Sequence, residues 1–384
     1  MFIRDLEHLV GIESGSYQPE GVEAVAAWMM ERLERLGASV ERFADAVGTA
    51  THVATFDGPA DGPTVLVLGH ADTVFQPGTS AARPLRTDGG RAFGPGVLDM
   101  KAGLLVALYA VTALRETATE GGPWLPVGRL VFIVNPDEEI GSPSSSAIIR
   151  SFAAEADAAL VLEAARANGD IVSARAGMTH LRMDIKGRPA HAGVEPERGA
   201  SAVLAAAHQV VALHALNDHA RGRSVNAGVV SGGTRPNIVP DAASITVDVR
   251  ARRRADQEAM LSAIEAIARS IGVPGTSTAL VRLANHWPME PTPASRHLAS
   301  LALRLAREHG WSMGQTDTGG ASDANTTAAL GVPSLDGLGP VGGGAHTPEE
   351  YLVLESVAPR TRLLAELIGA IGRDRAFRRS AESD

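Results

Sequence analysis

"LVLGHADTVF", residues 66–75, is an apolar run that stops at His70, with Asp72 two positions later. The apolar residues are continuous rather than alternating, which is typical of a strand buried on both faces of a sheet. Similar runs recur at residues 129–135 and 158–162, separated by helical patterns at 100–116 and 144–155. This alternation of strands and helices predicts an α/β fold with a mostly parallel sheet.

The pattern changes after residue 175. Residues 179–187 and 243–251 alternate polar and apolar side chains, as in strands with one solvated face, and helical patterns occur at 199–216 and 255–271. These elements predict a smaller α+β domain inserted at residues 176–284. A Pro-rich segment then returns to the first pattern, so the outer domain is expected to be discontinuous, with residues 1–175 and 285–384.

Composition limits the function classes. The chain has 384 residues, a formal net charge of -9 and no cysteine. Histidine and carboxylate are therefore the only strong metal ligands, and the acidic balance disfavours nucleic acid as a partner. No run of eighteen apolar residues predicts a membrane span, and the N-terminal pattern lacks the apolar centre of a secretory signal. A cytoplasmic protein is expected.

Ionisable side chains follow the predicted parallel strands. His70 ends one strand, Glu138 and Glu139 follow the strand at 129–135, Glu163 follows the next strand, and His346 lies beyond a strand at 332–335. Open α/β sheets bind ligands at the carboxyl ends of their strands. We therefore expect these side chains to meet at one edge of the sheet.

Imidazoles and carboxylates in this arrangement suit a pair of divalent metals. Asp99, in a Gly-rich loop before a helix, is the natural bridging ligand. Glu138, next to Glu139, could instead take a proton from water. Asp72 could accept the second N–H of His70 and fix the tautomer of the imidazole.

Each feature also has a purely structural interpretation. A lone His-x-Asp pair is often incidental, residues 137–139 could be a solvated turn, and Asp99 could be a helix N-cap. Thr347, Pro348 and Glu350 have the spacing of a helix-capping box, which would explain the turn after His346 without a metal. The occurrence of all these features in one chain favours the metal site.

Several motifs resemble one family across nearly the whole chain. They are "GHADTV", "GPGVLDMKAG", "PDEEIGS", "GRPAHAG", "GGTRPNIVPD", "TGGASDA" and "GGGAHTPEEY". Together they resemble the two-zinc exopeptidases that include bacterial glutamate carboxypeptidase, succinyl-diaminopimelate desuccinylase and aminoacylase, and glutamate carboxypeptidase most of all. The resemblance implies hydrolysis of an amide bond, with release of a C-terminal amino acid such as glutamate from a peptide or N-acyl amino acid. The alternative is an N-deacylase of small molecules.

The resemblance also implies two Zn²⁺ ions per subunit, with Co²⁺ or Mn²⁺ as substitutes. Asp99 would be shared between the ions, Glu138 would be the general base, and Asp72 would orient His70. The implied ligands are His70, Asp99 and Glu163 for one ion, and Glu139, Asp99 and His346 for the other.

The substrate side is implied by the resemblance as well. His191 would stabilise the oxyanion from the smaller domain of a partner subunit, so a homodimer through residues 176–284 is expected. Asn237 would contact the substrate, Arg250 would bind its carboxylate, and Gly319 and Gly320 would line the site. A solvated loop for His191 and a solvated sheet face for Arg250 are the structural alternatives.

Two positions depart from glutamate carboxypeptidases. Ala321 stands where those enzymes carry a third glycine, and Ile171 stands near the position of a lysine. Both departures weaken the case for glutamate as the released residue, and neither affects the expected metal ligands.

Overall fold

The structure is a computed structural model that describes residues 1–45, 48–118, 123–270 and 273–377. The chain forms two compact units. Unit 1 comprises Met1–Ala174, Pro291–Asp317 and Ser322–Asp384, and unit 2 comprises Arg175–Glu290 and Thr318–Ala321. The insertion predicted at 176–284 falls within unit 2, which also takes the short segment Thr318–Ala321.

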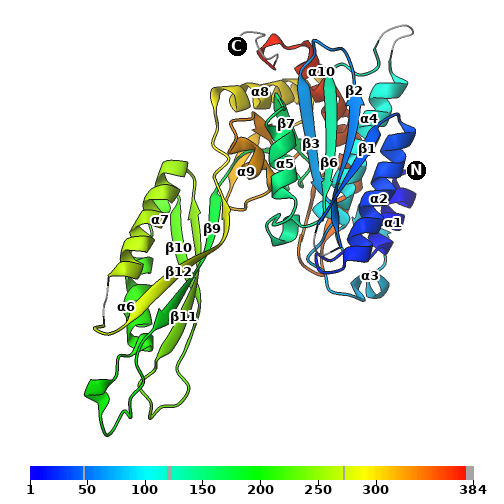
Figure 1. Ribbon diagram of the computed structural model, residues 1–384. Coiled ribbons are helices and arrows are strands. Elements are labelled where there is room, and N and C mark those ends of the chain that lie inside the picture. Colours follow the sequence, from blue (N-terminus) through cyan, green and yellow to red (C-terminus); the bar gives the residue numbers. More distant parts are fainter. Residues whose placement is uncertain (46–47, 119–122, 271–272, 378–384) are drawn as a thin grey trace. The chain divides into compact units, whose positions relative to one another are not determined.

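Unit 1 is built on a six-stranded sheet in the order β1-β2-β6-β3-β7-β14 (Figure 1). β6, β3, β7 and β14 run parallel, whereas β1 and β2 form an antiparallel edge. The α/β class with a mostly parallel sheet is therefore confirmed, although sequence analysis did not identify β1 and β2. The strands are β1 Ser39–Ala44, β2 Ala50–Asp57, β3 Thr64–His70, β6 Arg129–Asn135, β7 Ala158–Val161 and β14 Ser334–Leu335.

Both faces of this sheet are covered, which explains the continuous apolar strands. Val65 and Val67 of β3 pack into a core formed with α1, α2, α4, α8 and α10. Leu66 and Leu68 are equally buried and point to the opposite face, where α5 and α9 lie (Figure 1). The helices are α1 Phe2–Gly11, α2 Pro19–Arg35, α3 Thr79–Ala82, α4 Ala102–Glu116, α5 Ser146–Ala153, α8 Pro293–Glu308, α9 Asp323–Ala328 and α10 Val357–Arg373.

The helical stretch Val97–Glu116, which includes α4, is long and apolar enough to cross a membrane by length and composition. However, 72% of its most apolar window is buried inside the protein. Its apolar character is therefore explained by its place in the core of unit 1, between the sheet and α10.

Unit 2 contains an antiparallel sheet in the order β10-β11-β9-β12, with α6 and α7 packed against it. Ile245, Val247 and Val249 of β11 are buried against these helices, as their alternation predicts. Sequence analysis missed β12 because this edge strand is largely exposed and has only a weak apolar pattern. The elements are β9 Gly177–Lys186, β10 Arg223–Gly232, β11 Ala242–Ala251, β12 Ser277–His286, α6 Ala202–His214 and α7 Arg254–Arg269.

Short strands carry the loops around the candidate site. One small sheet has the order β15-β16-β5-β4, and a second pairs β13 with β8. Their bounds are β4 Arg86–Asp88, β5 Arg91–Phe93, β8 Ile171–Arg175, β13 Gln315–Thr318, β15 Gly342–Gly343 and β16 Tyr351–Val353.

Candidate active site

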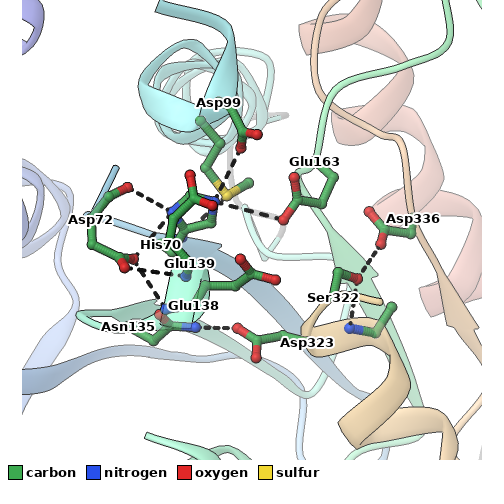
Figure 2. A network of polar contacts seen from close by, with 12 residues as sticks. His70, Asp72, Asp99, Asn135, Glu138, Glu139, Glu163, Ser322, Asp323 and Asp336 are labelled. Carbon is green, nitrogen blue, oxygen red and sulfur yellow. Dashed lines mark hydrogen bonds and ion pairs between the residues drawn. The ribbon is translucent and has the colours of Figure 1, made fainter. Parts of the chain in front are cut away.

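Three neighbouring parallel strands of unit 1 end at the candidate site (Figure 2). β3 ends at His70, which pairs in register with Asn135, the last residue of β6. Glu138 and Glu139 lie in a short helical turn just after β6, and Glu163 follows β7. The parallel register therefore places these side chains at one edge of the sheet, where open α/β sheets bind ligands.

The imidazole of His70 is buried, and its two nitrogens have different partners. Nδ1 lies 2.9 Å from the main-chain oxygen of Asp72 and 3.3 Å from its Oδ1. Nε2 lies 3.2 Å from Asp99 Oδ1 and 3.7 Å from Glu163 Oε1. When Nδ1 carries the proton and donates it to Asp72, Nε2 keeps a lone pair directed toward the carboxylates, as a metal ligand requires.

Asp99 faces both imidazoles of the site. Its Oδ2 lies 3.2 Å from His346 Nε2, and its Oδ1 faces His70. His346 Nε2 is also 3.1 Å from Glu139 Oε2. His346 has a φ of 66°, in a region that non-glycine residues rarely adopt and that is concentrated at functional sites. Asp99 is thus placed as a carboxylate shared by two groups of candidate ligands.

Potential ligand atoms lie within 4.8 Å of one another in two groups that share His70. One group adds Asp99 and Glu139, and the other adds Glu138 and Glu163. The structure thus brings together all the side chains predicted as ligands, but it also puts Glu138 within reach of a metal position. The division of these ligands between two ions stays a prediction.

Carboxylates outnumber imidazoles in this buried cluster. Burial, and then the charge of Glu163, raise the pKa of Glu138 well above its usual value. Burial also raises the pKa of Glu139, whose Oε1 is buried without a hydrogen-bond partner. An unpaired buried carboxylate oxygen is costly unless a partner or a metal satisfies it. The residues present therefore fit a pair of divalent cations, which would supply both the missing charge and the missing coordination.

The imidazoles respond to the same charges. Burial lowers the pKa of His70, but the carboxylates of Asp72 and Asp99 outweigh burial and raise it well above its usual value. Hydrogen bonds to Asp99 and Glu139 raise the pKa of His346 to about 10. A metal binds neutral imidazole and must displace these protons, so metal affinity should fall as the pH is lowered.

Asp72 has a wider structural role than sequence analysis assigned. Its side chain is fully buried, and its oxygens accept hydrogen bonds from the main-chain N–H groups of Glu138 at 3.1 Å and Glu139 at 3.2 Å (Figure 2). Ser16 Oγ donates a further hydrogen bond to Oδ2 at 2.7 Å. One carboxylate therefore positions both His70 and the turn that carries the two glutamates.

Sequence analysis missed a second supporting carboxylate, Asp323, although the quoted motif "TGGASDA" contains it. Asp323 begins α9, accepts a hydrogen bond from the side chain of Asn135, and accepts another from Ser142 Oγ at 2.7 Å. Burial raises its pKa to about 7. Because Asn135 and Ser142 flank the Glu138–Glu139 turn, Asp323 fixes both ends of that loop.

Glu350 corrects the predicted capping box. No helix begins after Thr347 in this described part of the chain; a turn leads directly into β16. The buried carboxylate of Glu350 instead accepts main-chain hydrogen bonds from Gly96 at 2.8 Å, Leu98 at 2.8 Å and Asp99 at 2.9 Å. Glu350 therefore joins the loop of His346 to the turn that presents Asp99.

Glu350→Gln should weaken metal binding. The amide replaces one acceptor oxygen with an NH₂ group that faces a backbone N–H, so a buried donor loses its partner at a cost of about 1–3 kcal/mol. The turn of Asp99 should shift, and metal affinity should fall by about 10–100-fold, as for other groups that orient ligands. Competition with a chelator measures this affinity. Glu349→Gln, at the exposed neighbouring position, is the matched control; equal affinities in both variants would contradict the assigned role.

Unit 2 contains the residues predicted to contact substrate. The main-chain N–H of Ala192, next to His191, donates to the carbonyl of Asn237 at 3.0 Å, so His191 and Asn237 are brought close together. His191 is exposed, and its Nδ1 accepts a hydrogen bond from Gly193 N at 3.1 Å. Their roles in catalysis stay predictions.

Arg250 and the glycine segment form another pair within unit 2. Arg250 Nη1 lies 3.3 Å from the carbonyl oxygen of Gly319, and its Nε donates to Asp248 at 3.0 Å. Gly320 O accepts from Arg175 Nη1 at 3.0 Å. Asp248 thus fixes the guanidinium of Arg250 and leaves part of its N–H groups for a ligand. In unit 1, by contrast, Ile171 is fully buried in the core and does not face a substrate.

A parallel sheet whose strand ends present imidazoles and carboxylates in this way defines an α/β hydrolase of the metal-dependent class. The chain belongs to Peptidase family M20/M25/M40, which it matches over residues 66–370. Its members are hydrolases that use divalent metals. The family suggested by the motifs is therefore confirmed.

Individual relatives agree with this membership. The chain is 30% identical over 375 residues to carboxypeptidase G2 of Pseudomonas sp. (strain RS-16), which covers 96% of this chain and 89% of the relative. It is 30% identical over 259 residues to succinyl-diaminopimelate desuccinylase 2 of Shewanella loihica, covering 62% of this chain and 66% of the relative. The crystal structure of aminopeptidase PepT from Bacillus cereus ATCC 10987 superimposes with a TM-score of 0.78 at 25% identity, covering 97% and 98% of the two chains.

Proposed function

We propose that this protein is a two-zinc hydrolase that releases a C-terminal amino acid from a peptide or N-acyl amino acid. The observation that carries the proposal is the position of Asp99, whose two carboxylate oxygens face His70 and His346 separately. Glu138 adds a carboxylate of raised pKa to the same cluster. Glutamate is the first released amino acid to test, because carboxypeptidase G2 is among the relatives.

The ligands fit two Zn²⁺ ions, with Co²⁺ or Mn²⁺ as possible substitutes. In this proposal Asp99 is shared, His70 and Glu163 complete one ion's ligand set, and Glu139 and His346 complete the other's. When bound, such ions polarise a carbonyl oxygen and make water more acidic.

Glu138 would perform the proton transfers. As general base it would take a proton from the attacking water, and it would then give this proton to the leaving amine. Its raised pKa suits both steps, because a carboxylate of ordinary pKa is a weak acid donor near neutral pH. Asp72 and Asp323 would act indirectly by fixing the loop of Glu138.

Unit 2 would supply the selection of substrate. Arg250 offers a fixed fork of donors that matches the carboxylate of the released amino acid, next to Gly319 and Gly320. Asn237 would contact the substrate, and His191 would donate to the developing oxyanion from a partner subunit. A homodimer through unit 2 and a cytoplasmic location belong to the same proposal. A fully active monomer in light scattering would remove the role of His191 across subunits.

The second candidate is an N-deacylase of small molecules. The match to succinyl-diaminopimelate desuccinylase 2 favours it, and the same metal ligands would serve it. The two candidates differ in the acyl side of the substrate rather than in the chemistry of the amide bond.

A substrate panel tests the first candidate. Dipeptides and N-acyl amino acids are compared with their C-terminal amides; amidation should lower kcat/KM by about 10–100-fold, because Arg250 loses a charged hydrogen-bond partner. In Arg250→Gln this discrimination should largely disappear. Equal turnover of acids and amides by the wild type would argue against release of a C-terminal amino acid, and a strong preference for simple acyl groups over peptides would favour the N-deacylase.

A further inference from the structure

A hollow of about 310 Å³ lies beside Glu139 within unit 1. Residues 15–18, 73–77 and 139–140 line it, so its walls come from the turn before α2, the segment after His70, and the turn that carries the catalytic candidates. Its volume is at the lower end of the range for small-molecule sites, which suits part of a ligand rather than a whole one. We name it the Tyr17 hollow.

The walls of the Tyr17 hollow are fixed to the candidate site. Ser16 N donates to Thr73 O at 3.0 Å, and Thr73 N donates to Ser14 O at 2.8 Å, so the first two walls pair with each other. Ser16 Oγ also donates to Asp72, the carboxylate that positions His70. The hollow therefore belongs to the same rigid framework as the metal ligands.

Its side chains are apolar and unusually exposed. Tyr17 is 82% exposed, Ile140 is 40% exposed and Val74 is 36% exposed. Large apolar side chains that gather at a concave surface mark binding sites more often than single exposed ones do. The position next to Glu139 identifies the substrate of the candidate site as the occupant.

The charge around the hollow excludes an anionic occupant. Within the described residues, its lining contains no lysine, arginine or histidine, and Glu139 is its one ionisable acid. Gln18, a neutral lining residue, already donates to the main-chain oxygen of Phe75 at 3.3 Å. Arg83 lies 4.8 Å from the centroid of the Phe75 ring, yet it does not line the hollow. A carboxylate here would meet Glu139 without a cation to pair with.

The first turn of α2, which adjoins the hollow, offers little to an anion. It begins with Pro19, which has no N–H, and Glu20 adds a negative charge. The N–H groups of Gly21 and Val22 are already bonded to Gln18 O. The positive end of this helix is therefore largely satisfied.

We propose that the Tyr17 hollow binds an uncharged apolar or aromatic group on the acyl side of the scissile amide. This inference rests on the proposed function, in which the carboxylate of the released amino acid is bound by Arg250. In a peptide the occupant is the penultimate side chain; in a conjugate it is an N-acyl group such as benzoyl. Acyl groups with a terminal carboxylate, such as succinyl, are poor occupants.

The test compares two substrates that differ only in the acyl group, N-benzoyl and N-succinyl conjugates of one released amino acid. The wild type should have a kcat/KM about 10-fold or more higher for the benzoyl conjugate, a difference typical of an apolar subsite. Tyr17→Arg places a cation at the hollow, and Tyr17→Gln is the matched uncharged control. Because Tyr17 is exposed, both variants should fold.

Relative to Tyr17→Gln, Tyr17→Arg should raise the succinyl-to-benzoyl ratio of kcat/KM by about fivefold. Val74→Lys, on the opposite wall, should raise this ratio in the same direction. A wild type that prefers the succinyl conjugate, or a ratio that is the same in the arginine and glutamine variants, would overturn the inference while leaving amide hydrolysis intact. Failure to hydrolyse either conjugate or any dipeptide would instead overturn the proposed function, and this inference with it.

Discussion

Glu138→Gln is expected to lower kcat by about 10²–10⁴-fold, the usual contribution of a general acid–base group. The amide has nearly the same shape as the carboxylate, but it can neither accept a proton from water nor return one to the leaving amine. Glu138 is also grouped with His70 and Glu163 as a potential metal ligand, so metal content must be measured together with kcat. A base-only role requires that the variant retain its metal.

Glu139→Gln is the matched comparison for this experiment. Glu139 faces His346 at 3.1 Å and has a buried oxygen without a hydrogen-bond partner, so its variant should lose metal as well as activity. Loss of metal from Glu138→Gln as well would show that Glu138 is a ligand and that the base assignment is wrong. Activity within a few-fold of the wild type would contradict any catalytic role.

The pH profile gives an independent measure of the same role. Burial and the charge of Glu163 raise the pKa of Glu138, and a general base works only when it is deprotonated. Wild-type kcat should therefore be low below this pKa and rise as the pH passes through it. In Glu138→Gln this acidic limb should be absent, whereas a variant that merely perturbs folding would keep it.

The parts of the site that could be predicted from sequence are those governed by strand periodicity. β3, β6 and β7 are continuous apolar runs, and the residues that follow each run necessarily meet at one edge of a parallel sheet. His70, Glu138 and Glu163 were placed correctly at that edge for this physical reason. Asp99 and His346 lie on loops, and only their motifs indicated that they would join the cluster.

The supporting contacts could not be predicted because they join residues far apart in the chain. Glu350 has the local spacing of a capping box, yet it accepts hydrogen bonds from a turn 251–254 positions earlier. Asp323 joins Asn135 and Ser142 in the same long-range manner. A single sequence carries local propensities, whereas these carboxylates satisfy buried backbone and side-chain donors that only the folded chain brings together.

The same reasoning applies to the sheet edges. β1 and β2 add an antiparallel edge to a parallel sheet, and β12 is an exposed edge strand of unit 2. Edge strands are buried less completely and have weaker patterns than central strands, so they are the strands that sequence periodicity misses. None of them presents a residue predicted for the site, and the interpretation of the site was therefore unaffected.

Asp99→Ala is expected to abolish activity by removing metal. Asp99 faces His70 and His346 with separate oxygens, and no other carboxylate among the described candidate ligands has both contacts. Metal affinity should fall by more than the about 10–100-fold typical of a group that only orients a ligand. The number of metal ions per chain, measured on the purified protein, should drop together with kcat.

A chelator provides the companion experiment. Wild-type protein should lose activity when the metal is removed and regain it when Zn²⁺ is added back, whereas Asp99→Ala should not recover at the same Zn²⁺ concentration. Asp88→Ala, at an exposed position of β4, is the control and should behave as the wild type. Because a bound metal stabilises the folded state by mass action, the wild type should also show a higher Tm with Zn²⁺ than without it, and Asp99→Ala a smaller difference. Full metal content and activity in Asp99→Ala would mean that Asp99 is not a ligand, and the assignment of a shared carboxylate would have to be abandoned.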